Sequence, residues 1–230
     1  SHTQVRSIER LAPLPKKRFA ATERFARAGL LTGTCLMPVL PGISDDDATL
    51  ESVVRWTADH GGRFVLVGAL TLADQQREYF TGVLEERFAH LRSLYRSLYP
   101  TGSYAPAGDY NLRLGRRVHE LCIRHGLADR IPRPVIPSDR RALNKRVVER
   151  LANQAYALEL ESAPAQRVWA YRKAAWAIEE LEQDLGLVSR ELGLRGLQSI
   201  PGVGPHLASE MQSLVVEIAT ADLRAHTTPA

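Results

Sequence analysis

The residues best suited to chemistry lie in one glycine-containing segment, residues 196–211, which reads GLQSIPGVGPHLASEM. Pro201 and Gly202 end one helical pattern, and Pro205 begins another at a position where the missing proline N–H costs nothing. Gly202 and Gly204 allow a partner to approach the backbone closely, and the first N–H groups of the second helix carry partial positive charge. The segment therefore predicts an anion-binding nest that suits a phosphate.

Apolar residues at helical spacing predict the helices that position this segment. Before the turn these residues are Leu194, Leu197 and Ile200, and after it they are Leu207, Met211, Leu214, Val215 and Ile218. Earlier helical patterns at residues 143–158 and 164–181 bring the total to four, and each stripe is too narrow to stand alone. Trp169 and Trp176 share one helix face, where we expect core or interdomain packing rather than stacking on bases.

Residues 143–217 resemble the N-terminal domain of X-family DNA polymerases, the small helical domain of the polymerase beta type. The sequences VWAYRKAA at 168–175, AI at 177–178 and LQSIPGVG at 197–204 carry the likeness. The resemblance implies that the hairpin amides bind a DNA phosphate and that three backbone carbonyls hold a monovalent cation. The implied DNA-binding residues are Arg167, Arg172, Lys173, Gly202, Val203, Gly204 and His206, and the implied cation ligands are Gln198, Ile200 and Val203.

This sequence departs from the polymerase pattern in ways that disfavour lyase activity and weaken the expected binding to DNA. Glu210 stands where lyase members carry a Schiff-base lysine, and a carboxylate cannot form that imine, so lyase activity is disfavoured. His206 replaces a residue that is always charged, and Pro205 removes an N–H near the phosphate. Residues 141–230 hold 10 Lys and Arg against 11 Asp and Glu. The alternative, a hairpin that mediates protein–protein interaction, therefore stays open.

Positive charge is concentrated in the first part of the chain. The whole sequence has a formal net charge of +4, and residues 1–140 hold 20 basic residues against 15 acidic ones. Seven arginines against three acids fall within residues 113–140. These arginines could follow a nucleic-acid backbone or keep a linker soluble. We favour the linker, because no aromatic residue alternates with them as a base-stacking platform requires.

Residues 3–99 alternate strand and helix patterns. Apolar runs at 5–11, 30–37 and 63–70 predict strands. Helices are expected between and after them, at 15–28, from a Ser44 cap to Gly61, and at 72–99. The last of these helices should be weakly interrupted near Gly82. Such strands predict parallel crossovers in a sheet covered on both faces. Three strands are too few to close, so we expect further strands upstream. The expected fold class is α/β plus all-α: a partial parallel (β/α) barrel segment followed by a four-helix helix-hairpin-helix domain.

The first part also carries a family resemblance. ERLAPLPKKR at 9–18, FARAG at 25–29 and the pattern Pro38-x-x-Pro-Gly-x-x-Asp45 resemble the C-terminal part of a radical SAM barrel of the spore photoproduct lyase type, over residues 3–72. The resemblance implies S-adenosylmethionine and a 4Fe–4S cluster as cofactors of the full-length protein, and a role in DNA repair. It implies a wall of the S-adenosylmethionine pocket at Met37, Pro38, Val39 and Pro41. In the alternative interpretation, the two prolines only shape a loop at a strand end.

The cluster-binding motif of that family has no counterpart here. Cys35 and Cys122 do not form a three-cysteine motif, so the cluster ligands are expected upstream, in the missing N-terminal half of the barrel. We expect three parts: a barrel segment at 1–99, an arginine-rich connector at 100–140 and a DNA-binding domain at 141–230. No apolar run reaches membrane-spanning length and no leader pattern opens the chain, which predicts a cytoplasmic protein without a membrane partner. The predicted function is a radical enzyme delivered to DNA by contacts that do not read sequence. The alternative is a non-catalytic module that binds protein.

Overall fold

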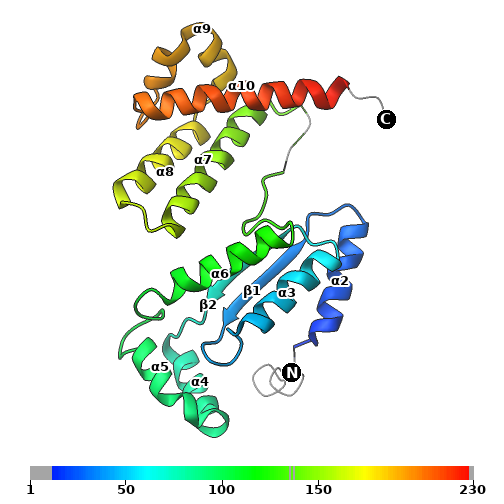
Figure 1. The fold of residues 1–230 in the computed structure, drawn as a ribbon, viewed down its shortest axis with the longest axis vertical. Coiled ribbons are helices and arrows are strands. Elements are labelled where there is room, and N and C mark those ends of the chain that lie inside the picture. Colours follow the sequence, from blue (N-terminus) through cyan, green and yellow to red (C-terminus); the bar gives the residue numbers. More distant parts are fainter. Residues whose placement is uncertain (1–11, 135, 137, 228–230) are drawn as a thin grey trace. The chain divides into compact units, whose positions relative to one another are not determined.

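A computed structural model describes residues 12–134, 136 and 138–227, and the described chain divides between Pro132 and Arg133 into two compact units (Figure 1). The boundary differs from the expected one. Helix α6 (Tyr110–Arg124) lies within the expected connector, but it buries Leu114 and Val118 in the core of the first unit. An amphipathic helix must bury its apolar stripe, so most of the segment expected to be a free connector belongs to the first unit.

Two parallel strands form the sheet of the first unit. β1 (Gly33–Val39) pairs with β2 (Phe64–Ala69), and the crossover between them is α3 (Asp47–Asp59). Helices α3 and α6 both pack on one face of this sheet. The Val65 amide donates to the Ala128 carbonyl at 2.9 Å, which places Ala128 beside β2. The parallel crossover is confirmed, whereas the strand expected at 5–11 lies outside the described residues.

Only one sheet face is covered within the described residues. Cys35 is exposed, and the side chain of Met37 on the same face of β1 is 47% exposed. Because strand side chains alternate, the neighbours of these two residues face α3 and α6 instead. The expectation of a sheet covered on both faces does not hold for the described residues, and two strands cannot by themselves form a barrel segment.

The helices of the first unit correct two local predictions. Helix α2 (Pro15–Arg27) begins as expected, but α3 is capped by Asp46, whose carboxylate accepts from the Thr49 amide at 2.9 Å. Ser44 instead accepts from the Leu40 amide. The expected long helix is divided into α4 (Asp74–Arg87), a short 3-10 turn η1 (Ala89–Leu91) and α5 (Arg92–Leu98). The break falls at Phe88 rather than Gly82, because Phe88 turns inward against the cluster around Phe80 and Tyr95.

The second unit confirms the four expected helices. They are α7 (Ala142–Leu160), α8 (Ala165–Glu179), α9 (Leu185–Gln198) and α10 (Pro205–Thr227), and they enclose one apolar core. Gly193 interrupts α9 with φ 59° and ψ −146°. The kink leaves Leu194 40% exposed, so Leu194 does not join the buried stripe as predicted, while Leu197 and Ile200 do. Among the described residues, no helix is long and apolar enough to cross a membrane.

Candidate nucleic-acid interface

The structure has a turn between α9 and α10 where the proline and glycine pattern predicted one. The Val203 amide donates to the Ile200 carbonyl at 3.0 Å, and the buried Val203 side chain anchors the turn in the core. Gly202 has φ +80°, a conformation that side-chain-bearing residues rarely adopt. Gly204 lies in open space, and nothing would contact a Cβ there within 4 Å. Gly202 is therefore required by the backbone, whereas Gly204 keeps the surface accessible.

The start of α10 presents backbone donors to solvent. Its first hydrogen bond at the turn runs from the Ala208 amide to the Gly204 carbonyl at 2.9 Å. The N–H groups that precede Ala208 have no partner within the helix, and the positive end of the helix dipole lies at the same place. Gly202, Gly204 and His206 are all exposed here. This arrangement has the exposed backbone donors that the predicted anion nest requires, less the one that Pro205 lacks.

Helix α8 supplies a cation close to the turn. A Cβ placed on Gly202 would lie 3.4 Å from the Cβ of Lys173, so α8 supports the hairpin directly. Lys173 is exposed, and no ion pair is found for it among the described residues. Arg172, the cation next to it on this helix, is paired with Glu159 at 2.6 Å. Lys173 is thus available to a phosphate bound at the turn.

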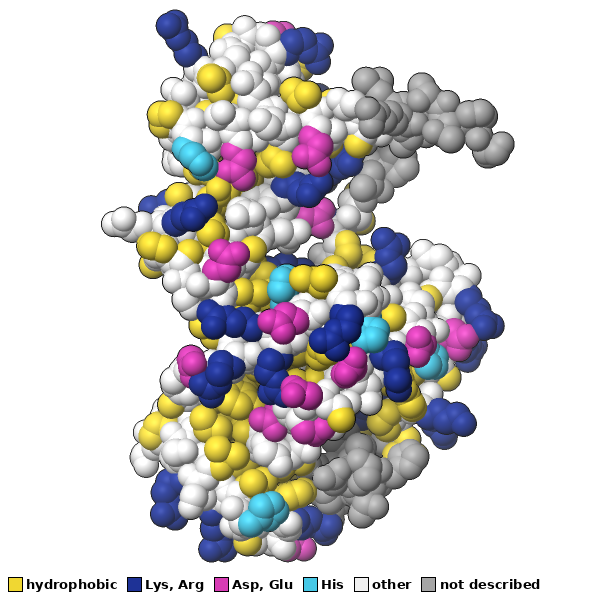
Figure 2. Space-filling view, viewed as in Figure 1, with side chains coloured by type: hydrophobic (Ala, Val, Ile, Leu, Met, Phe, Trp, Pro, Cys, Tyr) yellow, Lys and Arg dark blue, Asp and Glu magenta, His cyan; other side chains and the backbone are white. Residues whose placement is uncertain are grey.

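Acidic side chains are interspersed among the basic ones on the second unit (Figure 2). Arg150 pairs with Glu217 at 2.8 Å and Arg133 with Glu179 at 2.6 Å. Ion pairs of this kind leave little excess positive charge for a polyanion. The surface therefore agrees with the nearly balanced charge count of residues 141–230.

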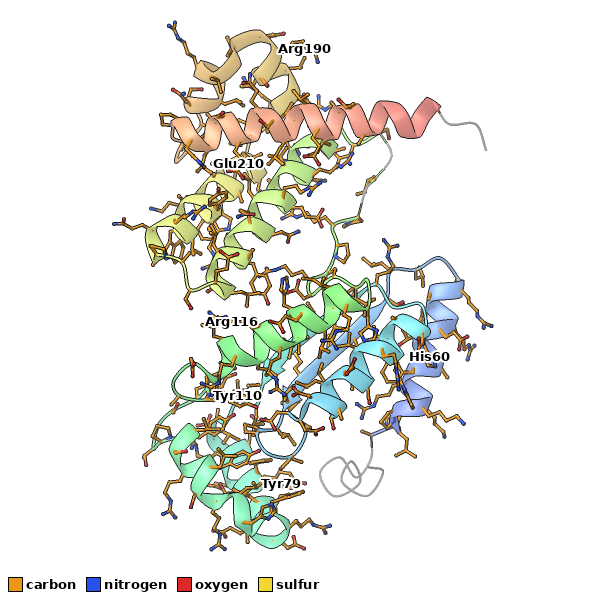
Figure 3. All side chains as sticks on the ribbon, in the orientation of Figure 1. His60, Tyr79, Tyr110, Arg116, Arg190 and Glu210 are labelled. Carbon is orange, nitrogen blue, oxygen red and sulfur yellow. The ribbon has the colours of Figure 1, made fainter. Side chains whose placement is uncertain are left out.

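A polar cluster around Glu210, which Figure 3 labels, joins α8 to α10. The Tyr171 hydroxyl donates to Glu210 Oε2 at 2.6 Å, and His206 Nδ1 lies 4.0 Å from the same oxygen. Burial, together with the Glu210 carboxylate, raises the pKa of Tyr171 to about 12, while Arg167 opposes this shift. The structure thus brings four residues together: Arg167, Tyr171, His206 and Glu210. Sequence reasoning had named three of them but had placed Tyr171 only in the core.

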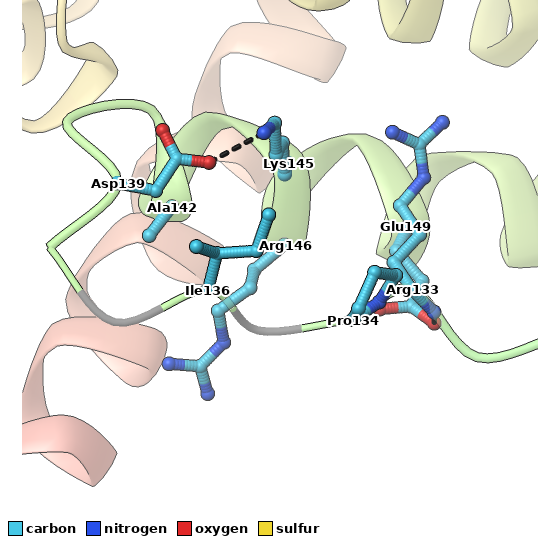
Figure 4. A pocket seen from close by; sticks show the side chains of 8 residues that line it. All are labelled: Arg133, Pro134, Ile136, Asp139, Ala142, Lys145, Arg146 and Glu149. Atoms are coloured by element: carbon cyan, nitrogen blue, oxygen red, sulfur yellow. Dashed lines mark hydrogen bonds and ion pairs between the residues drawn. The ribbon is translucent and has the colours of Figure 1, made fainter. Parts of the chain in front are cut away.

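A small pocket along the first turns of α7 offers a second concave surface (Figure 4). Its lining contains three cations, Arg133, Lys145 and Arg146, and none of them is without a partner. Lys145 binds Asp139, and Arg133 pairs with Glu179 while its amide donates to Glu149. A pocket whose cations are already neutralised is a weak anion site. We therefore place the interface at the hairpin.

The arginine-rich segment holds the first unit together. Arg117 pairs with Asp47 at 2.6 Å and also donates to the Asp45 carbonyl, and Arg124 pairs with Glu51 at 3.1 Å. These contacts tie α6 to α3 and to the loop before it. They support neither a phosphate track nor a free linker for this part of the segment.

The residues predicted for S-adenosylmethionine are divided between surface and core. Met37 and Pro38 are exposed, whereas Val39 and Pro41 are buried. Cys35 is exposed on β1, and burial raises the pKa of the Cys122 thiol on α6 to about 12. Two cysteines so placed do not fit a cluster site, and no group of three His, Cys, Asp or Glu side chains among the described residues could hold a metal ion. The pocket wall and the cofactors remain predictions.

The predicted cation site lies at the end of α9. Gln198 is the last residue of that helix, and the Ile200 carbonyl already accepts the Val203 amide. A carbonyl oxygen has two lone pairs, so this hydrogen bond leaves room for one further interaction. Cation binding by Gln198, Ile200 and Val203 stays a prediction.

Comparison with known proteins identifies a domain in the second unit. Residues 142–217 match the helix-hairpin-helix domain family. Three uncharacterized proteins, one from Mycobacterium bovis and two from strains of Mycobacterium tuberculosis, are each 33% identical over 130 residues. The match covers 56% of this chain but only 38% of each relative, so the chain spans less than two fifths of the relatives it matches. No solved structure matches the chain.

The second unit therefore contains a helix-hairpin-helix domain, a type of domain compatible with nucleic-acid binding. The comparisons give no support to the radical SAM resemblance of the first unit.

Proposed function

We propose that the helix-hairpin-helix domain binds the DNA backbone without reading sequence, and so attaches the chain to DNA. The observation that carries this proposal is the hairpin itself: a left-handed turn at Gly202, an exposed start of α10 and an available Lys173 on the helix that supports the turn. Backbone N–H groups and one nearby cation suit a phosphate oxygen. None of these groups distinguishes one base from another.

Three features indicate modest affinity. Glu210 places a carboxylate beside the turn, Pro205 lacks an N–H, and residues 141–230 hold 11 acidic residues against 10 basic ones. If Arg167 and Lys173 each neutralise one phosphate, raising salt from about 50 to 200 mM weakens binding about 12-fold. A protein with many phosphate contacts would lose far more.

The test is a titration of the full chain with a labelled short duplex, followed by fluorescence anisotropy across that salt range. Gly204→Val places a side chain over the nest without straining the turn, because the site is open and its backbone is ordinary. We expect a loss of roughly tenfold or more, the equivalent of one hydrogen bond to a charged group. Gly82→Val, at another open glycine on α4, is the matched control. Unchanged affinity in Gly204→Val would exclude the hairpin as the DNA site.

The alternative function is a non-catalytic module that binds another protein. The balanced charge of residues 141–230 favours it. Absence of DNA binding by the wild-type chain at about 50 mM salt, where phosphate contacts are strongest, would support this alternative.

For the first unit we propose membership of a larger parallel sheet, as its resemblance to radical SAM proteins of the spore photoproduct lyase type implies. The uncovered face at Cys35 and Met37 supports this, since parallel sheets are normally covered on both faces. The cofactors and any role in DNA repair would then depend on residues beyond this chain. We further propose that the protein is cytoplasmic. The longer mycobacterial relatives provide the test: purified without oxygen, they should contain iron and acid-labile sulfide. Iron-free preparations would contradict the proposal.

A further inference from the structure

Helix α8 carries two exposed tryptophans that the predicted packing does not explain. Trp169 is 45% exposed and Trp176 is 55% exposed, so the expected packing in a core is wrong, while the alternative of interdomain packing stays a prediction. The inward face of α8 consists of other residues, namely Val168, Tyr171, Ala174, Ala175 and Ile178. One helix cannot bury both faces in a bundle of this size, and the tryptophans fall on the outer one. Large apolar rings kept at a surface indicate a binding site.

The two rings are held in a defined arrangement. Their centroids lie 5.9 Å apart with the planes at 64°, an edge-to-face contact. The Arg172 guanidinium lies 5.4 Å from the centre of the Trp169 ring, and Glu159 fixes that guanidinium at 2.6 Å. The rings are thus positioned before a partner arrives, which reduces the entropy lost on binding.

The tryptophans also lie beside the hairpin. At 100° per residue, Trp169 and Trp176 fall between Arg172 on one side and Lys173 on the other. Lys173 in turn contacts the turn at Gly202. We call Trp169, Arg172, Lys173 and Trp176 the tryptophan stripe, and Figure 2 shows hydrophobic and basic side chains next to one another over α8. The stripe therefore continues the proposed phosphate site along α8.

We propose that the tryptophan stripe stacks on unpaired bases of single-stranded DNA whose neighbouring phosphate is held by the hairpin. This inference rests on the proposed function and specifies its substrate. Alternating aromatic and basic residues are the composition of single-strand binding platforms. In an intact duplex the faces of the bases are covered by their neighbours, so exposed rings gain little from it. DNA with a gap or a single-stranded end offers both a phosphate and open bases.

The charge of the stripe favours DNA over a protein partner. Both polar members of the stripe are cationic, and both flank the rings rather than lying at a distance. Arg172 is paired with Glu159, so Lys173 is the one of the two that can meet a phosphate beside a stacked base. Stacking also tolerates any base, which agrees with a hairpin that does not read sequence.

The experiment compares three labelled DNAs, a single strand, a gapped duplex and an intact duplex, against the full chain by anisotropy. In the double variant Trp169→Ala/Trp176→Ala, affinity for the single strand and the gapped duplex should fall roughly fivefold or more per lost stacking contact. Affinity for the intact duplex should stay within about twofold, since stacking on paired bases contributes little. The single variant Trp169→Phe keeps an aromatic ring at position 169, so its affinity should fall much less than that of the double variant. Leu192→Ala, at another exposed apolar residue of the same unit, is the control.

The outcomes separate this inference from the proposed function. Gly204→Val should weaken binding to all three DNAs, because the phosphate contact is common to them. If the double tryptophan variant binds single strands as the wild type does, or loses duplex and single strand equally, the stacking inference is overturned while DNA binding survives. If the wild type binds none of the DNAs, both fail.

In a Trp56→Phe background, saturating single-stranded DNA should quench fluorescence from the two remaining tryptophans, and lack of quenching would contradict stacking.

Discussion

The hydroxyl of Tyr171 donates a 2.6 Å hydrogen bond to Oε2 of Glu210, joining α8 to α10 beside the hairpin. The resemblance to polymerases predicts that Glu210 stands in the place of a lysine nucleophile. Here the carboxylate accepts a hydrogen bond within the domain, so it contributes to the helix packing. Its negative charge also lies near the proposed phosphate, where it opposes binding.

Removing that charge should increase DNA affinity. In Glu210→Gln the side chain keeps its shape and an acceptor for Tyr171, but it no longer repels a phosphate. We expect duplex binding at low salt to strengthen about two- to fivefold, the size of one partly exposed charge interaction. Anisotropy titrations measure the effect. Glu191→Gln, at an exposed acid on α9, should change affinity much less. Equal gains in both variants would mean that only the net charge matters.

Tyr171 should make the second unit sensitive to alkali. Its pKa is raised to about 12 by burial and by Glu210, while an unfolded tyrosine ionises near pH 10. The folded state therefore holds the proton more tightly, so this stability is present below about pH 10 and is lost as pH rises towards 12. Tyr171→Phe should lose stability less steeply over that window. Urea unfolding followed by tryptophan fluorescence at several alkaline pH values measures the slope, and identical slopes would contradict the assignment.

Asn144 should be essential to the stability of the second unit. Its side chain is buried; it donates to the Gln183 carbonyl at 2.9 Å and to the Leu181 carbonyl at 3.3 Å, and it accepts from the Leu185 amide at 2.8 Å. Asn144→Ala leaves these backbone groups without their partner and should cost about 2–4 kcal/mol. Urea unfolding measures the loss. Asn153→Ala, at an exposed position of the same helix, should cost under about 1 kcal/mol, and similar losses in both would refute the role of Asn144.

The two hairpin glycines should differ in their effect on stability. Gly202→Ala forces a side chain into a left-handed conformation and should cost about 1–2 kcal/mol. Gly204→Ala meets no neighbour and should leave stability within about 0.5 kcal/mol of the wild type. Thermal or urea unfolding of Gly202→Ala and Gly204→Ala measures the difference in their stability. Equal stability of the two variants would show that the turn does not depend on Gly202.

Local patterns were sufficient to predict much of the second unit. The four helices, the turn at Pro201 and Gly202, and the inward stripe of Leu207 and Met211 were all predicted correctly. Each depends on residues within a few positions of one another: helical spacing, a proline stop and a glycine in a left-handed turn. In the first unit the same signals located β1 and β2 and the helix between them.

The sequence by itself determined the helix-hairpin-helix arrangement, since its helix spacing and turn residues act locally. Tertiary structure decided which side chains are free to act. Whether Trp169 faces core or solvent depends on which side of α8 the other helices cover, and Glu210 meets Tyr171 across 39 positions of sequence. The break at Phe88 and the packing of α6 against the sheet likewise depend on distant contacts. Such contacts form only when the chain closes on itself, so periodicity alone could not assign them.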